Sequence, residues 1–108
     1  MIPQIGAKPL AAKIDAGEPV FLLDVRQRWE HEIASIPGSV LIPLSELGGR
    51  LGEVEPPDNA LVVVYCHHGI RSLAAVEFLQ KHGLKSVASL TGGIDAWAVE
   101  VEPGMARY

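Results

Sequence analysis

Continuous apolar runs and one amphipathic segment dominate the pattern of hydrophobic and polar positions along this chain. Residues 20–25 and 61–65 are almost wholly apolar and rich in valine and leucine, which is typical of β-strands buried on both faces. Residues 72–82 instead carry apolar side chains every three or four positions, which predicts an amphipathic helix. Buried strands that alternate with helices predict an α/β fold with a mainly parallel sheet.

Weaker patterns predict the remaining elements. Short strands are expected at residues 2–5, 40–42 and 86–90, and helices at residues 9–16, 27–33, 45–54 (capped by Ser45) and after Gly93, around Trp97. Right-handed crossovers would place helices on both faces of the sheet, giving three layers. Ligands of such folds bind beyond the carboxyl ends of the strands, and Cys66 directly follows the run at residues 61–65.

Composition and charge narrow the classes of protein. With 108 residues, the chain is expected to form a single domain over residues 1–108. The net charge of −4 and the scattered basic residues argue against a nucleic-acid partner. The longest apolar run is too short to span a bilayer, and the N-terminus does not resemble a signal peptide. A single cysteine excludes an internal disulfide, so we expect a cytoplasmic protein with no membrane partner.

The segment after residues 61–65 carries the candidate chemistry. It reads Cys66, His67, His68, Gly69, Ile70, Arg71 and Ser72, and it joins a predicted strand to a predicted helix. The N–H groups and partial positive charge of a helix N-terminus stabilise a thiolate, and the guanidinium of Arg71 adds a permanent charge suited to oxyanions. Gly69 allows a tight loop whose N–H groups converge on one sulfur or oxyanion. These features predict that Cys66 is a nucleophile.

Each of these residues also has a purely structural interpretation. A lone cysteine that ends a buried strand is often an inert core residue. Arg71 and Ser72 can be solvent-facing residues at a helix start, with Ser72 as the cap. The combination of Cys66, Gly69, Arg71 and Ser72 on a strand–loop–helix favours the nucleophile.

The loop resembles the active-site loop of rhodanese-like sulfurtransferases. Further segments resemble that family in the same order along the chain: Leu23, Asp24, Val25, Arg26, Trp29 and Glu30; Ile36, Pro37, Gly38, Ser39, Ile42 and Pro43; and Leu90, Thr91, Gly92, Gly93 and Trp97. The chain departs from the family at Ala34 and Ser35, where Gly-His is common, and the adjacent His67 and His68 are not a fixed family feature.

The resemblance implies a three-layer rhodanese-like fold and a persulfide on Cys66. The family moves sulfane sulfur from a small anionic donor such as thiosulfate to cyanide, a thiol or a protein acceptor, without a cofactor or metal. By this resemblance the donor would bind at the residues that follow Cys66: His67, His68, Gly69, Ile70, Arg71 and Ser72.

Loop length separates two branches of this fold. Cys66 to Arg71 is six residues, which resembles the sulfur-transferring members. Related cell-cycle phosphatases and arsenate reductases have a loop one residue longer, which makes room for a tetrahedral oxyanion. The shorter loop favours a single sulfur atom over phosphate.

For other polar and aromatic residues, the sequence gives weaker support for a role in binding or catalysis. A metal site at His67 and His68 is disfavoured because adjacent side chains rarely converge on one ion. Arg26 is either a second positive charge near the substrate or, as the pattern favours, the ion-pair partner of Glu30 four residues on. Asp24 is expected to hold loop backbone. Both tryptophans, Trp29 and Trp97, are expected to be packing anchors.

Two other functions remain open. The first is a persulfide carrier that serves cofactor biosynthesis or RNA thiolation with little small-molecule turnover. The residues Met105, Ala106, Arg107 and Tyr108 resemble the tails of rhodanese domains fused to ubiquitin-like-protein adenylyltransferases. The second is an inactive interaction module, which the presence of both Cys66 and Arg71 disfavours.

Overall fold

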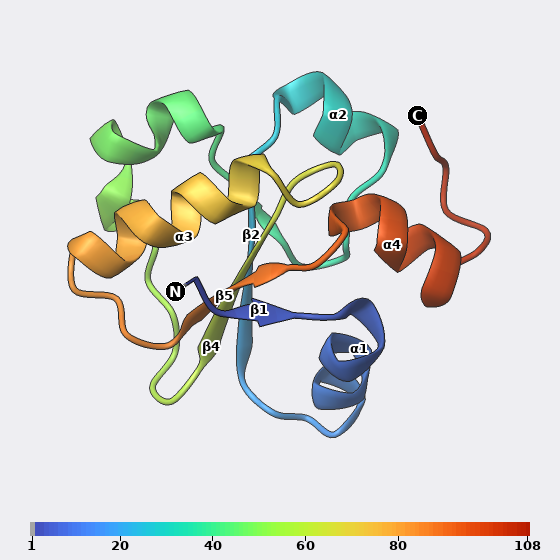
Figure 1. Ribbon diagram of the computed structural model, residues 1–108, viewed down its shortest axis with the longest axis horizontal. Coiled ribbons are helices and arrows are strands. Elements are labelled where there is room, and N and C mark those ends of the chain that lie inside the picture. Colours follow the sequence, from blue (N-terminus) through green and yellow to red (C-terminus); the bar gives the residue numbers. More distant parts are fainter. Residues whose placement is uncertain (1) are drawn as a thin grey trace.

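The computed structural model describes residues 2–108, which form one five-stranded sheet (Figure 1). All strand pairs are parallel, and the strand order is β1-β5-β4-β2-β3. The strands are β1 (Gln4–Ile5), β2 (Val20–Asp24), β3 (Val40–Leu41), β4 (Leu61–Tyr65) and β5 (Val87–Leu90). The predicted α/β fold with a parallel sheet is confirmed.

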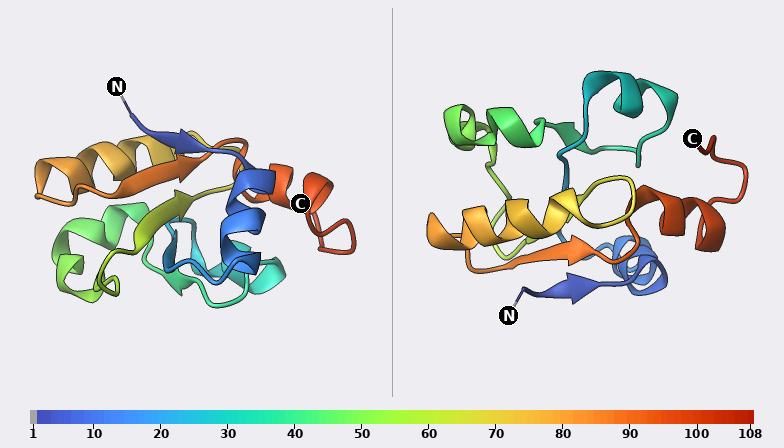
Figure 2. Two further views of the ribbon diagram at one scale, coloured as in Figure 1. Left: turned by 90° about the horizontal axis from the view of Figure 1, so that it is seen from below. Right: turned by 45° about the horizontal axis from the view of Figure 1, so that its top comes forward.

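Helices cover both faces of this sheet. They are α1 (Ala7–Asp15), α2 (Arg28–Ile33), α3 (Arg71–Lys81) and α4 (Gly93–Glu100), together with two 3-10 helices, η1 (Leu44–Gly49) and η2 (Leu51–Glu53). Helices α1 and α4 lie side by side on one face, and α3 packs with η1 on the other (Figures 1 and 2). The sheet is thus the middle of three layers.

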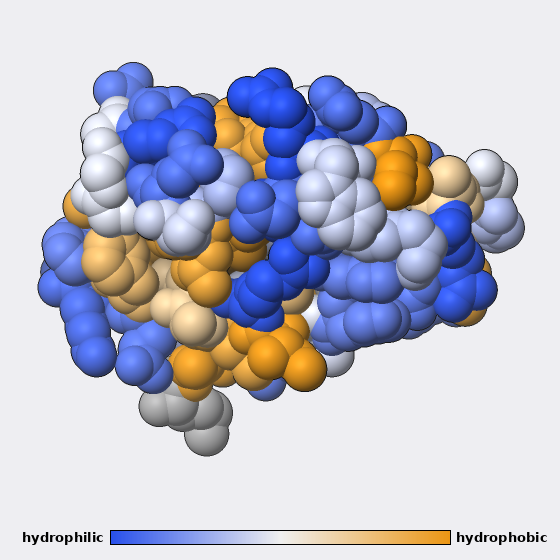
Figure 3. Space-filling model, turned by 90° about the horizontal axis from the view of Figure 1, so that it is seen from above, coloured by the Kyte–Doolittle hydropathy of each residue, from blue (hydrophilic) through white to orange (hydrophobic). Residues whose placement is uncertain are grey.

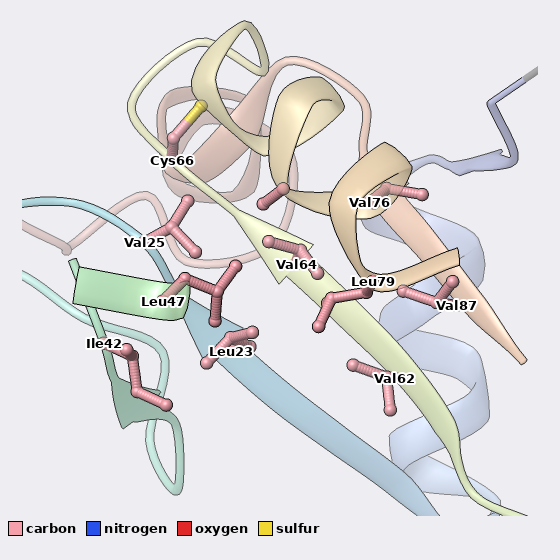
Figure 4. Packing of buried hydrophobic residues seen from close by; sticks show 11 residues of the cluster. Leu23, Val25, Ile42, Leu47, Val62, Val64, Cys66, Val76, Leu79 and Val87 are labelled. Carbon is pink, nitrogen blue, oxygen red and sulfur yellow. The ribbon is translucent and has the colours of Figure 1, made fainter. Parts of the chain in front are cut away.

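Alternate side chains of β4 enter the two hydrophobic cores. Val62 and Val64 pack beneath α3 and η1, whereas Val63 and Tyr65 pack against α1 and α4. Successive side chains of a strand point to opposite faces, so a strand covered on both faces must be apolar throughout. Cys66 continues the alternation and therefore belongs to the core beneath α3 (Figure 4).

One predicted helix is wrong, and so is one alternative interpretation, that of Ser72 as a helix cap. The helix expected at residues 45–54 is replaced by η1 and η2, and Ser45 does not cap either of them. Three glycines in this stretch lower the stability of an α-helix, which explains the shorter 3-10 turns. Helix α3 begins at Arg71, so Ser72 is not its cap but lies fully buried in its first turn.

The molecular surface in Figure 3 is mainly polar, with hydrophobic side chains gathered chiefly toward one side of that face. Exposed large hydrophobic residues include Trp29, Ile70 and Val99. Within residues 2–108, no helix combines the length and apolar character that a membrane span requires.

Candidate functional site

Cys66 lies just beyond β4, beside the first turn of α3 (Figure 4). The residue is only 1% exposed. Its Sγ atom accepts hydrogen bonds from the backbone N–H groups of Gly69, at 3.2 Å, and of Ser72, at 3.4 Å. N–H groups at a helix N-terminus have no intrahelical partner, so they are free to point at this sulfur. The local environment therefore stabilises a negative charge on Sγ.

Helix α4 holds the carbonyl groups of the Cys66 loop. The N–H groups of Ile94 and Asp95 donate to the carbonyl oxygens of Cys66, at 2.8 Å, and His67, at 3.1 Å. In a planar trans peptide the N–H and C=O groups point in opposite directions, so the next two N–H groups are turned away from α4. Within residues 2–108, four N–H groups of the loop have no hydrogen-bond acceptor: those of His67, His68, Ile70 and Arg71.

Two glycines permit this arrangement. Gly69 has a φ of +96°, a conformation that glycine adopts without a steric penalty. Gly93 has a φ of +61° and lies so close to the loop that a Cβ atom there would collide with the carbonyl oxygens of Cys66 and His67. The close approach of α4 to the loop therefore depends on Gly93.

Arg71 forms a two-point ion pair with Glu30 of α2. Its Nη1 and Nη2 atoms donate to the two carboxylate oxygens, each at 2.8 Å. These hydrogen bonds outweigh burial and hold the pKa of Glu30 at about 2. The same bonds raise the pKa of Arg71. Much of the guanidinium charge is thus compensated by Glu30.

The predicted ion pair between Arg26 and Glu30 is wrong. Arg26 is fully buried, and its Nε and Nη2 atoms donate to the carboxylate of Asp24 at 2.8 and 2.7 Å. Glu30 accepts from Arg26 only through its backbone oxygen, 3.3 Å from Nη1, and not through its carboxylate. Burial opposes the charge of Arg26, but its bonds to Asp24 and Tyr108 prevail and raise its pKa. Arg26 therefore does not face solvent as a second substrate-binding charge.

Asp24 organises the end of β2. Its Oδ1 atom accepts the backbone N–H of Arg26 at 3.0 Å, in agreement with the expectation that it holds loop backbone. Its Oδ2 atom lies 2.7 Å from Nδ1 of His31. With Arg26 and His31 as partners, this fully buried carboxylate is engaged on both oxygens.

Tyr108 is a site residue that the sequence does not reveal. Its hydroxyl donates to Oε2 of Glu30 and accepts from Nη1 of Arg26, each at 2.8 Å. Its ring stacks on the ring of His67, with the centroids 4.0 Å apart. Burial is the main reason that the pKa of Tyr108 rises to about 12. Tyr108 thus joins the Arg71–Glu30 pair to the buried Arg26.

The two loop histidines differ in their surroundings. His67 lies between the rings of Tyr108 and His68, and burial followed by the charge of His68 lowers the pKa of His67. The side chain of His68 is 62% exposed, and its Nδ1 atom lies 3.9 Å from a carboxylate oxygen of Asp95. In the part of the chain that the structure describes, no three His, Cys, Asp or Glu side chains are grouped to hold a metal ion.

Besides Arg71 and the two histidines, the predicted site residues fall into three groups. Gly69 and Ser72 contact the sulfur of Cys66 directly. Asp24 and Arg26 lie behind the Arg71–Glu30 pair, whereas Ile70 is 76% exposed at the surface. Site residues that sequence reasoning did not assign are Glu30 as the partner of Arg71, Ser89, Gly93 and Tyr108.

The tryptophans also differ. Trp97 is 4% exposed and anchors α4 in the core, as expected. Trp29 is 58% exposed, so its prediction as a packing anchor is wrong. Its ring meets the ring of Tyr108 edge-on, with the centroids 5.8 Å apart. Trp29 therefore extends an exposed aromatic surface beside the loop.

Comparisons with known proteins agree with one another. The model of the Rhodanese-like domain family matches residues 6–100. The chain is 37% identical over 95 residues to the probable adenylyltransferase/sulfurtransferase MoeZ of Mycobacterium tuberculosis, covering 88% of this chain and 24% of that protein. It is 37% identical over 101 residues to the putative sulfur carrier protein YrkF of Bacillus subtilis, covering 94% of this chain and 54% of that protein. This chain therefore spans about half or less of the length of these two relatives.

Among the solved structures that match over nearly their whole length, one has a particularly informative sequence similarity. It is the rhodanese-related protein from Thermoplasma volcanium, which is 39% identical in sequence and superposes with a TM-score of 0.81. The match covers 94% of this chain and 95% of that protein chain. The sheet and helices that position Cys66 are therefore shared with a solved structure.

The close contact between α4 and the loop predicts that Gly93→Ala strongly lowers the free energy of unfolding. The added Cβ would push against the carbonyl oxygens of Cys66 and His67, so urea unfolding should show a loss of roughly 1–3 kcal/mol beyond that of Gly17→Ala. Gly17 is a matched control because it has a similar positive φ, +75°, and a Cβ added there would have no atom within 4 Å. Equal losses in the two variants would show that the loop adjusts freely.

The low pKa of Glu30 predicts that the protein loses stability in acid. Its folded pKa, about 2, lies below its ordinary value of 4.5, so its stabilisation is present above pH 4.5 and is lost as the pH falls toward 2. The free energy of unfolding should therefore fall across this window by about 3 kcal/mol more than in Glu30→Gln. Urea unfolding at several pH values measures this, and parallel profiles would contradict it.

Proposed function

This chain belongs to the rhodanese-like domain family, and we propose that it transfers sulfane sulfur through a persulfide on Cys66. The family match and the relatives confirm the resemblance seen in the sequence. The observation that carries the proposal is the set of backbone N–H groups around Sγ. Two of them already donate to the sulfur, and four more of the loop have no acceptor within residues 2–108.

In the first half-reaction the Cys66 thiolate attacks the outer sulfur of a donor such as thiosulfate. A new S–S bond forms at Cys66, the S–S bond of thiosulfate breaks, and sulfite leaves with the electron pair of that bond. Arg71 helps to bind the anionic donor through the three N–H groups that Glu30 does not occupy. The negative charge moves to the outer sulfur of the persulfide.

The loop stabilises this outer sulfur. Backbone N–H groups held in place by the surrounding fold bind an anion without reorganising, which makes them effective in a buried site. The N–H groups of His67 and His68 are turned away from α4 because their preceding carbonyls bond to it. A loop of this size suits one sulfur atom better than a full phosphate.

In the second half-reaction an acceptor attacks the outer sulfur, and the Cys66 thiolate leaves. Cyanide gives thiocyanate in this step, and a thiol or a protein thiol gives a new persulfide. Because the enzyme alternates between two covalent forms, ping-pong kinetics follow. The sequence of steps uses no cofactor and no metal.

A second candidate function is a sulfur carrier that passes the persulfide to a partner enzyme. It is favoured by the similarity to the putative sulfur carrier YrkF and to MoeZ, and by the packing of Tyr108 against the loop. Both functions require the same persulfide. They differ in how quickly small acceptors remove its outer sulfur.

Intact-protein mass spectrometry tests the persulfide. Reduced protein incubated with thiosulfate should gain the mass of one sulfur atom, and cyanide should remove it, because Cys66 is the only cysteine. Cys66→Ser is the matched control and should gain nothing. A wild-type protein that stays unmodified at every donor concentration would sink the proposal and leave an interaction module.

The rate of discharge separates the enzyme from the carrier. For the enzyme, loaded protein mixed with cyanide should lose its outer sulfur at least as fast as the steady-state turnover with thiosulfate and cyanide. This follows because each half-reaction of a ping-pong scheme must be as fast as the overall cycle. Quenched samples analysed by mass spectrometry give the rate. A persulfide that forms readily but survives excess cyanide or thiol would point to the carrier.

A further inference from the structure

Two buried hydroxyl groups lie in a row behind the sulfur of Cys66. The Oγ atom of Ser72 is 3.5 Å from Sγ, and the Oγ atom of Ser89 is 2.7 Å from that of Ser72. Both serines are fully buried. Ser89 is opposite Val64 in the register of β5 and β4, so its side chain lies on the same face of the sheet as Val64 and Cys66.

Ser89 interrupts an otherwise apolar strand. The other residues of β5 are Val87, Ala88 and Leu90, and all are buried. A buried hydroxyl is unfavourable unless it is hydrogen-bonded, and the side-chain partner of Ser89 among residues 2–108 is Ser72. An alanine would satisfy the apolar pattern, so the hydroxyl requires an explanation outside packing.

Every proton of this row has an acceptor when the sulfur is an anion. Each hydroxyl has one proton to donate. If a Cys66 thiol donated to Ser72, Ser72 would donate to Ser89, and the proton of Ser89 would have no side-chain acceptor in the described chain. If the sulfur is a thiolate, Ser89 donates to Ser72 and Ser72 donates to Sγ, so every proton has an acceptor.

We propose that Ser89 is a positioning residue that acts through Ser72, directing the Ser72 hydroxyl proton at Sγ and favouring the thiolate of Cys66. Together with the N–H groups of Gly69 and Ser72, the hydroxyl gives Sγ three donors. The inference rests on the proposed function, in which Cys66 is the nucleophile. It also concerns the second half-reaction, because the same three donors stabilise the Cys66 thiolate as a leaving group.

The pH profile of Cys66 alkylation by iodoacetamide tests this role. In Ser89→Ala the rate at pH 7 should fall about two- to tenfold, the range expected for losing one buried hydrogen bond, while the rate at high pH should match the wild type. Ser89→Thr keeps a hydroxyl and should restore the neutral-pH rate. A structural role alone would not move the profile along the pH axis.

Two further variants make the test specific. Ser39→Ala removes a hydroxyl that bonds to Tyr65 and to the backbone of Ile36, away from the sulfur, and should leave the profile unchanged. Because Ser89 acts through Ser72, the double variant Ser72→Ala/Ser89→Ala should alkylate no more slowly than Ser72→Ala alone. Additive losses in the double variant would overturn the relay, as would a wild-type profile in Ser89→Ala.

This result is independent of the persulfide experiment. If the Ser89→Ala profile moves but wild-type protein forms no persulfide with thiosulfate, the relay stands and the sulfurtransferase proposal fails. If persulfide forms normally and the profile does not move, the sulfurtransferase proposal stands and the relay is wrong. Urea midpoints of each variant confirm that the compared proteins are folded.

Discussion

The N-terminus of α4 holds the carbonyl groups of Cys66 and His67, and the proposed chemistry depends on that contact. A peptide group is rigid, so fixing its carbonyl on one side directs its N–H to the other. The contact is possible because β5, which leads to α4, lies next to β4, which leads to Cys66. Gly93 then lets the two backbones meet without a side chain between them. The parallel sheet thus brings together two segments that are distant in sequence, and their backbones form the proposed anion-binding loop.

Around this loop, charges are paired before any substrate arrives. Arg71 is held by Glu30 and Arg26 by Asp24, and the hydroxyl of Tyr108 connects the two pairs. Removing one member of a buried pair leaves an uncompensated charge, so such a network fixes the positions of its members more than it adds net stability. In the proposed reaction, the neutral N–H groups of Gly69 and Ser72 are therefore the main stabilisers of the thiolate, and the guanidinium of Arg71 binds the donor anion.

The elements predicted correctly from the sequence are those whose burial requires a recognisable pattern of apolar residues. The runs that became β2 and β4 are apolar because both faces of the sheet are covered, and α3 has its stripe because only one side of it is covered. The prediction of a helix at residues 45–54 rested on a capping serine, but the three glycines of this stretch disfavour an α-helix, and short 3-10 turns form instead.

The site was predictable only where the loop carried its own pattern. Cys66, Gly69 and Arg71 lie within one short segment, so their proximity follows from the sequence. The i, i+4 rule failed for Arg26 and Glu30 because Arg26 precedes α2 and turns back to Asp24. The contact of Tyr108 with Glu30 spans 78 residues. Ser89 lies in a strand, and nothing in the sequence around it indicates that its hydroxyl bonds to Ser72. Such contacts depend on the path of the whole chain.

The burial of Cys66 agrees with a role as a carrier of sulfur as well as with turnover of small donors. The proposed donor, thiosulfate, has a single sulfur atom at its reactive end, so that only this atom needs to approach a residue that is 1% exposed. In the proposed reaction an added sulfur lies about 2 Å beyond Sγ, the length of an S–S bond, and the N–H groups of the loop that have no acceptor within residues 2–108 are the donors proposed for it. In the proposed second half-reaction an acceptor needs to reach only the outer atom, while Sγ, the leaving group, keeps the N–H donors of Gly69 and Ser72. Burial would shield the Cys66 thiolate from solvent, and the outer sulfur of the proposed persulfide would be the atom that an acceptor contacts.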